Sequence, residues 1–189
     1  MQGVKSAKGK TAMHLLLEHL KNKLGDSVLE MIEARDMPVV ICKKESIYQT
    51  LKLLRDDPEL DFNILTDLSA VDYLNYPEKK RQRFEVVYHL HSLDKGHRLR
   101  VKVPVGGADP ALDSACTLWK TANWLEREVW DMYGIQFVNH PNLKRILNHI
   151  EFVGHPLRKD YPIDKRQVLT VNDSLMDEME KRLIEKGLK

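Results

Sequence analysis

The chain has 189 residues, of which 42% are hydrophobic and 31% are charged, and its formal net charge is +2. This length and composition predict one globular domain of ordinary character with additional segments. The near balance of charges excludes the clustered basic excess of nucleic-acid-binding proteins, and no run approaches the roughly 20 apolar residues of a membrane-spanning helix.

Residues 1–10 are polar and basic, and no hydrophobic segment follows them, so we expect a disordered tail rather than a secretion signal. We therefore expect a cytoplasmic or matrix location, with any membrane contact made through partners. The two cysteines, Cys42 and Cys116, lie outside any CxxC or Cys/His cluster. Two separate thiols cannot hold an iron–sulfur cluster, which usually takes four, so partly buried free thiols are expected.

Helical and strand-like patterns alternate over the first half of the chain. Apolar residues three and four apart predict a helix over 11–24 that ends at Gly25. A second helix is expected over 44–56, and Pro58 ends it. Alternating or apolar runs predict strands over 28–34, 37–42, 62–73, 84–93 and 97–105. This order indicates an α+β fold, in which a small mixed or antiparallel sheet carries helices packed on one face.

Residues 122–134 predict one more helix, and Gly134 supplies its left-handed cap. At about 100° per residue, the apolar and polar positions separate onto two faces. The apolar face holds Ala122, Leu125, Val129 and Met132, and the other face holds Trp124, Arg127, Glu128 and Asp131. Arg127 and Asp131 are four apart and are expected to pair. The helix either packs one face on the core or is covered on both sides.

The chain after Gly134 shows little periodicity and contains Pro141, Pro156 and Pro162. A Phe-Val-x-His-Pro pattern occurs twice, at 137–141 and 152–156. Proline excludes a regular helix or central strand, and an irregular segment must be solvated or lie along another surface. We therefore predict an α/β domain over 11–134 and an extended docking segment over 135–189, with a possible terminal helix over 172–187.

Two catalytic or metal-binding interpretations remain open from the sequence. Glu126, Glu128, Asp131 and His140 could serve an independent enzyme if they converged on a pocket. Alternatively, His140, His149 and His155 could form a zinc module, although their spacing matches no usual zinc pattern. An ion-pair network and backbone-bonded histidines are the plainer expectation for both sets.

Several stretches between 126 and 162 together are far more specific than any single motif. They are EREVWDMYGI at 126–135, His140-Pro141, Arg145-Ile146-Leu147, and GHPLRKDYP at 154–162. In this collinear order they resemble the signature of the 30 kDa, or C-type, subunit family of respiratory complex I, the proton-pumping NADH:quinone oxidoreductase (NDH-1). The chain departs from the family at Asn139, where glycine is usual. Asn tolerates the left-handed conformation better than most residues.

The resemblance implies an accessory subunit of the peripheral arm without activity or cofactor of its own. FMN and iron–sulfur clusters would belong to partner subunits, and the chief partner would be the 49 kDa-type (D-type) subunit. The complex would place the chain on the cytoplasmic side of the inner membrane, or on the matrix side in an organelle. Related F420H2 dehydrogenases, membrane-bound hydrogenases and plastid-type complexes use homologous subunits and remain alternatives.

The resemblance and the local chemistry also indicate which residues would form the interface with partner subunits. They are Trp124, Glu126, Arg127, Glu128, Asp131, Tyr133, His140, Arg145, His155, Arg158, Lys159 and Asp160.

Overall fold

The computed structural model describes residues 16–34, 37–165, 167 and 174–187, so the predicted tail over 1–10 lies outside the described residues. Residues 16–24 are helical, and short 3-10 turns occupy Gly25–Ser27 and Lys44–Ser46. The remaining elements are β1 (Val28–Ala34), β2 (Met37–Cys42), α2 (Ile47–Asp56), β3 (Ile64–Asp72), β4 (Phe84–His91), β5 (Arg98–Val105), β6 (Ala111–Asp113), α3 (Ala122–Tyr133), β7 (Gln136–Val138) and α4 (Ser174–Glu185).

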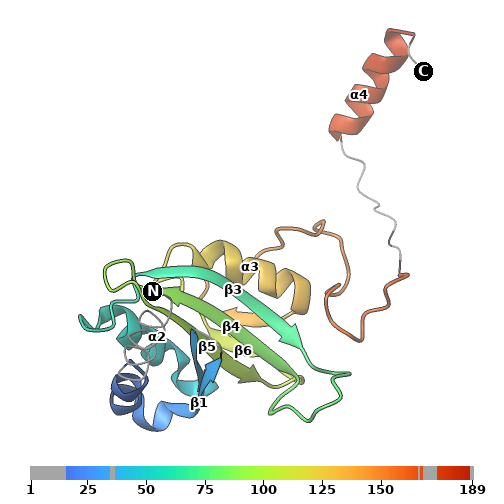
Figure 1. The fold of residues 1–189 in the computed structure, drawn as a ribbon. Coiled ribbons are helices and arrows are strands. Elements are labelled where there is room, and N and C mark those ends of the chain that lie inside the picture. Colours follow the sequence, from blue (N-terminus) through green and yellow to red (C-terminus); the bar gives the residue numbers. More distant parts are fainter. Residues whose placement is uncertain (1–15, 35–36, 166, 168–173, 188–189) are drawn as a thin grey trace, which may run out of the picture.

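Five strands form the main sheet in the order β1-β2-β5-β4-β3 (Figure 1). Neighbouring strands are antiparallel except β2 and β5, which pair in parallel with Val40 opposite Val101. The β3-β4-β5 meander is thus joined to the β1-β2 hairpin at the centre of the sheet. The predicted α+β class with a mixed sheet is confirmed.

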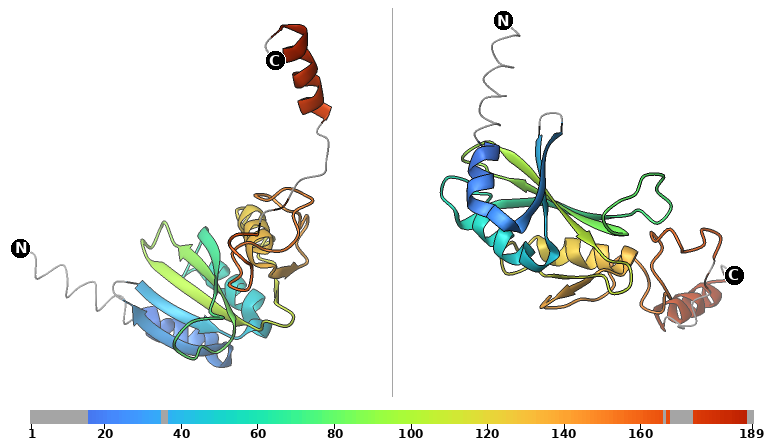
Figure 2. Two further views of the ribbon diagram at one scale, coloured as in Figure 1. Left: turned by 90° about the vertical axis from the view of Figure 1, so that its right-hand side faces the viewer. Right: turned by 90° about the horizontal axis from the view of Figure 1, so that it is seen from below.

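The N-terminal helix, α2 and α3 lie on one side of this sheet (Figure 2). Strand β5 shows why: Leu99, Val101, Val103 and Val105 are completely buried, while the residues between them are not. From the helices, residues such as Leu20, Leu51 and Leu54 pack into the same core. Each such aliphatic side chain contributes roughly 1.5–3 kcal/mol by leaving water. The opposite face of the sheet carries no described helix.

The predicted helices and strands of the first half are found within a few residues of their expected limits. The turn between β4 and β5 is closed by the Ser92 N–H, which donates to the His97 carbonyl at 3.0 Å, with Gly96 at φ 66°. One pair of strands was not expected. Strands β6 and β7 pair in parallel, and Leu112 lies opposite Phe137. Both are three residues long, too short for a period-two pattern.

The chain after β7 is irregular, with turns and bends through residue 165. Asn139 adopts the left-handed conformation at φ 64°, so the turn that a glycine would usually make is kept. Figure 1 shows α4, which falls within the helix expected over 172–187, away from the sheet. Among the described helices, none combines the length and apolar character that crossing a bilayer requires.

Candidate functional site

Helix α3 carries the most informative sequence and is fixed to the body by its apolar face. Ala122, Val129 and Met132 are buried, as the helical spacing predicts. The helix ends at Gly134, whose φ is 75° and whose N–H donates to the Trp130 carbonyl at 2.8 Å. A Cβ at this position would lie 2.6 Å from Cδ2 of His155. Gly134 is therefore required both for the cap and for the close approach of the later segment.

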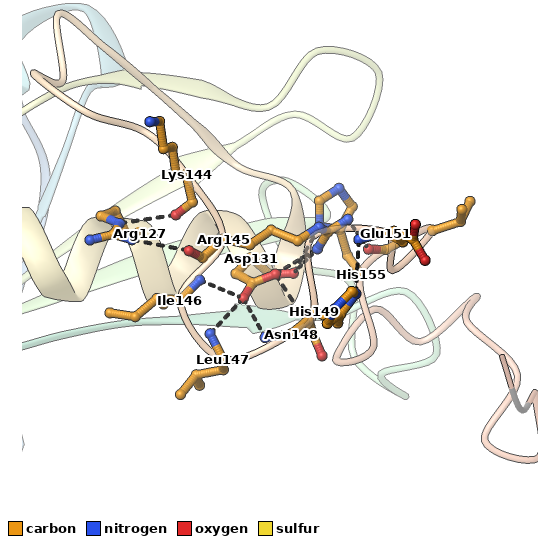
Figure 3. A network of polar contacts seen from close by, with 12 residues as sticks. Arg127, Asp131, Lys144, Arg145, Ile146, Leu147, Asn148, His149, Glu151 and His155 are labelled. Carbon is orange, nitrogen blue, oxygen red and sulfur yellow. Dashed lines mark hydrogen bonds and ion pairs between the residues drawn. The ribbon is translucent and has the colours of Figure 1, made fainter. Parts of the chain in front are cut away.

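Asp131, on the side of α3 that faces residues 144–148, is completely buried and organises the chain that follows β7 (Figure 3). Its carboxylate accepts hydrogen bonds from the backbone N–H groups of Ile146, Leu147 and Asn148 at 2.9–3.0 Å. It also accepts the Asn148 side-chain amide at 3.0 Å and pairs with Arg145 at 2.5 Å. Burial alone would raise the pKa of Asp131, but the donors of Asn148, Arg145 and Ile146 hold it well below its ordinary value.

Arg127 does not pair with Asp131, so the expected ion pair within α3 is wrong. Arg127 instead donates to the backbone carbonyls of Lys144 and Arg145, both at 3.0 Å. Its guanidinium also lies 5.2 Å from the ring of the exposed Trp124. The physical reason is that residues 144–148 fold back over this face of α3 and supply closer partners to both side chains.

Arg145 joins three parts of the irregular segment. Besides Asp131, it donates to the Gly154 carbonyl at 3.0 Å. Its guanidinium lies 5.7 Å from each of the rings of Trp130 and Phe152. A planar cation between two aromatic rings and a buried carboxylate leaves the loop little conformational freedom.

Glu126 lies at the start of α3 in a separate buried network. Its carboxylate accepts the Ser114 hydroxyl at 2.7 Å, the Ala115 N–H at 2.6 Å and the Cys116 thiol at 3.4 Å. Burial raises the pKa of Glu126, and the hydrogen bonds from Ser114 and Ala115 oppose that rise. The network ties the chain after β6 to the first turns of α3.

His140 lies beside Glu126 but is already bonded on both ring nitrogens. Its Nδ1 accepts the Asn142 N–H at 3.0 Å, which leaves Nε2–H to donate to the Asn123 carbonyl at 3.1 Å. The Nε2 to Glu126 Oε2 distance is 4.0 Å. Burial lowers the pKa of His140. The histidine therefore anchors the turn after β7 to α3.

The second His-Pro segment is anchored from two directions. His155 Nδ1 lies 3.0 Å from the Asp131 carbonyl oxygen, and the Leu157 N–H donates to the Met132 carbonyl at 3.0 Å. Further on, the side chain of Asp72 at the end of β3 accepts the Lys159 N–H at 2.9 Å. The segment thus lies between the end of α3 and the end of β3.

Arg83 completes this attachment. It pairs with Asp72 at 2.9 Å and with Asp160 at 2.8 Å. The hydrogen bond from Arg83, with help from Arg158, lowers the pKa of Asp160 to about 2. Burial alone would raise the pKa of Asp72, but Arg83 and the Lys159 N–H keep it below its ordinary value. Arg158 lies over the Phe84 ring at 5.4 Å. We call Asp72, Arg83 and Asp160 the clamp.

The residues expected at an interface divide into two groups. The side chains of Glu126 and Asp131 are completely buried within this chain, and the His140 side chain is also buried, so these three are not available at its surface. Exposed members are Trp124, Glu128, Lys159 and Asp160, and the half-buried ones are Arg127, Tyr133, Arg145, His155 and Arg158. The buried group shapes the loop, and only the second group can contact a partner directly.

Neither chemical alternative is supported by the geometry. Glu126 and His140 come together, but Asp131 faces the 144–148 loop and Glu128 is exposed, so the four do not share a pocket. Among the described residues, the sets close enough to share a metal are Cys116, Glu126 and His140, and His19, Asp57 and Glu59. The trio His140, His149 and His155 is not one of them. In the first set, every candidate ligand is already hydrogen-bonded.

The sequence did not predict the apolar side chains that the irregular stretch over 147–153 exposes. Leu147, Ile150 and Val153 are 63%, 83% and 68% exposed. We call these three residues the apolar loop. Large exposed aliphatics gathered in one irregular stretch mark interaction sites. Their only sequence signal was the presence of aliphatic residues where no helix or strand period requires them.

Comparison with known proteins decides the family. The model of the family described as respiratory-chain NADH dehydrogenase, 30 Kd subunit, matches residues 40–167. The chain belongs to this family. It is therefore a subunit of an enzyme complex of the NADH dehydrogenase type.

Proteins similar in sequence to this 30 kDa family member are named as subunits of the same type. The C-type subunit of the NADH-quinone oxidoreductase of Citrifermentans bemidjiense is 51% identical over 144 residues, covering 76% of this chain and 86% of that protein. The C-type subunit from Hyphomonas neptunium is 38% identical over 179 residues, covering 94% and 83%. These names do not favour the F420H2 dehydrogenase or hydrogenase alternatives.

Solved structures support the fold. A trypsin-resistant fragment (1–134) of Nqo5 matches with a TM-score of 0.61 and 34% identity, covering 69% of this chain and 98% of the fragment. A chain of the archaeal membrane-bound sulfane sulfur reductase complex matches with a TM-score of 0.65 over 90% of this chain. At 19% identity, the second likeness concerns the fold alone.

Proposed function

We propose that this subunit holds the redox subunits of the peripheral arm in position and binds no FMN or iron–sulfur cluster itself. Its docking surface consists of the apolar loop together with Trp124, Glu128, Lys159 and Asp160. The chief partner on this surface is the 49 kDa-type subunit. The whole assembly lies on the cytoplasmic side of the inner membrane, or on the matrix side in an organelle, and reaches the membrane through other subunits.

The observation that carries the proposal is that one loop has a firmly hydrogen-bonded backbone and yet exposes large apolar side chains. The backbone of residues 146–148 is bonded to a buried carboxylate, while Leu147 and Ile150 point their apolar surface into solvent. If the order of this loop served only the stability of the chain, its large aliphatic side chains would be expected to be buried. A rigid apolar tip loses little conformational entropy when a partner covers it, which favours tight association.

A single experiment tests the docking surface. The full chain carries an affinity tag, native membranes are solubilised, and the co-eluting subunits are identified and quantified. We expect cluster-bearing subunits and the 49 kDa-type subunit with the unaltered chain, and a loss of at least tenfold with Leu147→Asp/Ile150→Asp. The matched control is Leu74→Asp/Leu93→Asp, two exposed leucines in the turns after β3 and β4 that are 46% and 61% exposed. Equal recovery with both variants would refute the docking surface.

The absence of a bound cofactor is tested separately. The chain purified after dissociation of the complex is examined for flavin absorbance, for iron and for acid-labile sulfide. We expect none of them in stoichiometric amount. Flavin or iron that stays with the chain in a one-to-one ratio would overturn this part of the proposal.

A further inference from the structure

The side of the main sheet that faces away from the helices is rich in hydrogen-bond donors. On β5, Arg98, Arg100 and Lys102 alternate with completely buried core residues and therefore point to this side. On β4, His89 and His91 do the same, because Tyr88 and Leu90 point into the core. We call Arg98, Arg100, His89 and His91 the basic sheet face.

The register places these donors opposite one another. His89 lies opposite Arg100, and His91 lies opposite Arg98. Directly opposed residues of an antiparallel pair are neighbours. On its other side, His89 lies opposite Asp67 of β3, so this face carries one carboxylate beside the four basic side chains.

Two neighbouring cations on the same side have acidic partners. Lys102 pairs with Glu85 at 2.7 Å, and Arg81 pairs with Glu30 at 2.8 Å. Within the described part of the chain, Arg98 and Arg100 form no ion pair, and Nε of Arg100 is shielded from solvent without a hydrogen-bond partner. A buried donor without an acceptor is costly. A carboxylate docked on this face could instead pair with the guanidinium groups of Arg98 and Arg100, which have no acidic partner among the described residues.

The same area of the sheet is hollowed. A depression of about 270 Å³ is lined by Met37, Thr66, His89, His91 and Arg98 among others. Beside it on β2, Val39 is only 3% exposed although it faces this side. Arginine is enriched at protein interfaces, whereas a nucleic-acid surface would need a larger excess of positive charge.

We propose that the basic sheet face docks an acidic segment of a second partner protein, whose Asp or Glu side chains bind Arg98 and Arg100. This inference rests on the proposed function in one respect, because it places that partner in the same complex. It is otherwise separate from the apolar loop. The loop follows α3, which packs on the helical side of the sheet, so the two surfaces lie on different sides and one chain can bridge two neighbours (Figure 2).

The test uses the intact complex. A photo-crosslinking amino acid replaces Met37, which lines the depression, and native membranes are irradiated before purification. We expect a covalent adduct to a peptide of another subunit with an Asp or Glu within a few residues of the crosslink. An adduct to lipid or nucleic acid, an adduct to a segment without acidic residues, or the absence of any adduct would overturn the inference.

Charge reversal provides the second arm. Arg98→Glu/Arg100→Glu is expected to reduce recovery of the crosslinked subunit on the order of tenfold or more, and Arg98→Gln/Arg100→Gln to reduce it less. Lys52→Glu/Lys120→Glu is the matched control, since both exposed lysines lie on the helical side or its loops. Circular dichroism of each variant separates lost binding from lost folding, and the glutamine variant keeps the test valid if the glutamate variant misfolds.

The two proposals fail differently. If the unaltered chain recovers no redox subunits, the proposed function is wrong. If the unaltered chain and Arg98→Glu/Arg100→Glu recover the same subunits in the same amounts, only the acidic partner on the basic sheet face is excluded.

Discussion

The carboxylate of Asp131 and the guanidinium of Arg145 meet at 2.5 Å, fourteen residues apart, with the Asp131 side chain completely buried. Because Asp131 also accepts three consecutive backbone N–H groups, one side chain of α3 fixes the path of the loop over 145–148. Most of the hydrogen bonds that order residues 146–148 therefore come from one carboxylate.

Replacing that carboxylate should be strongly destabilising. We expect Asp131→Asn to lower the free energy of unfolding by about 3 kcal/mol, because it leaves Arg145 and the loop N–H groups without their anion. Glu128→Gln, an exposed position on the same helix, should change it by less than about 0.5 kcal/mol. Denaturant unfolding measures both values. Hydrogen exchange at Ile146–Asn148 should accelerate in the first variant, and unchanged exchange there would contradict the assignment.

Gly134 should be less replaceable than another glycine with a similar backbone. We expect Gly134→Ala to cost more than about 2 kcal/mol, because the left-handed conformation costs roughly 1–2 kcal/mol and the new Cβ collides with His155. At Gly96, φ is 66° and a Cβ would meet no atom within 4 Å, so Gly96→Ala should cost only the conformational part. Thermal or denaturant unfolding of both variants gives the difference, and equal costs would exclude the collision as the cause.

The clamp should make the free energy of unfolding depend on pH in the acid range. Because the folded-state pKa of Asp160 is lowered from 3.8 to about 2, its contribution is fully present above about pH 4 and is lost as pH falls toward 2. We expect Asp160→Asn to be less stable than the unaltered chain at pH 6 by up to about 1 kcal/mol, since the side chain is half exposed, and to converge with it near pH 2. The exposed Asp164 offers the control Asp164→Asn. A stability difference that does not change with pH would rule out the ion pair as its source.

The apolar loop should be dispensable for folding. Since Leu147 and Ile150 are 63% and 83% exposed, Leu147→Asp/Ile150→Asp should leave the free energy of unfolding of the isolated chain within about 0.5 kcal/mol per site. Chemical denaturation followed by circular dichroism checks this. A large loss of stability would mean that these side chains support the body itself, and a loss of co-purified subunits could not then be attributed to docking.

Local periodicity was enough to predict most of the fold. The strand with Leu99, Val101 and Val103 and the helix with Val129 and Met132 each carry their own pattern, and both are found. The parallel pairing of β2 with β5 has no local signal, because it joins residues about sixty positions apart. The expected partner of Asp131 was wrong for the same reason: spacing within α3 suggested Arg127, whereas the true partner comes from a stretch without any period.

The central pairing of β2 with β5 also sets an order of events during synthesis. Strand β2 can pair with β1 early, but its other edge stays unpaired until β5, which ends at Val105, has been made. The apolar loop is made later still, and at ~5–20 residues per second it follows the end of β5 by some seconds. All five strands of the main sheet can thus pair before the apolar loop has been made, so the sheet has no free pairing edge at β2 when these exposed aliphatic side chains appear.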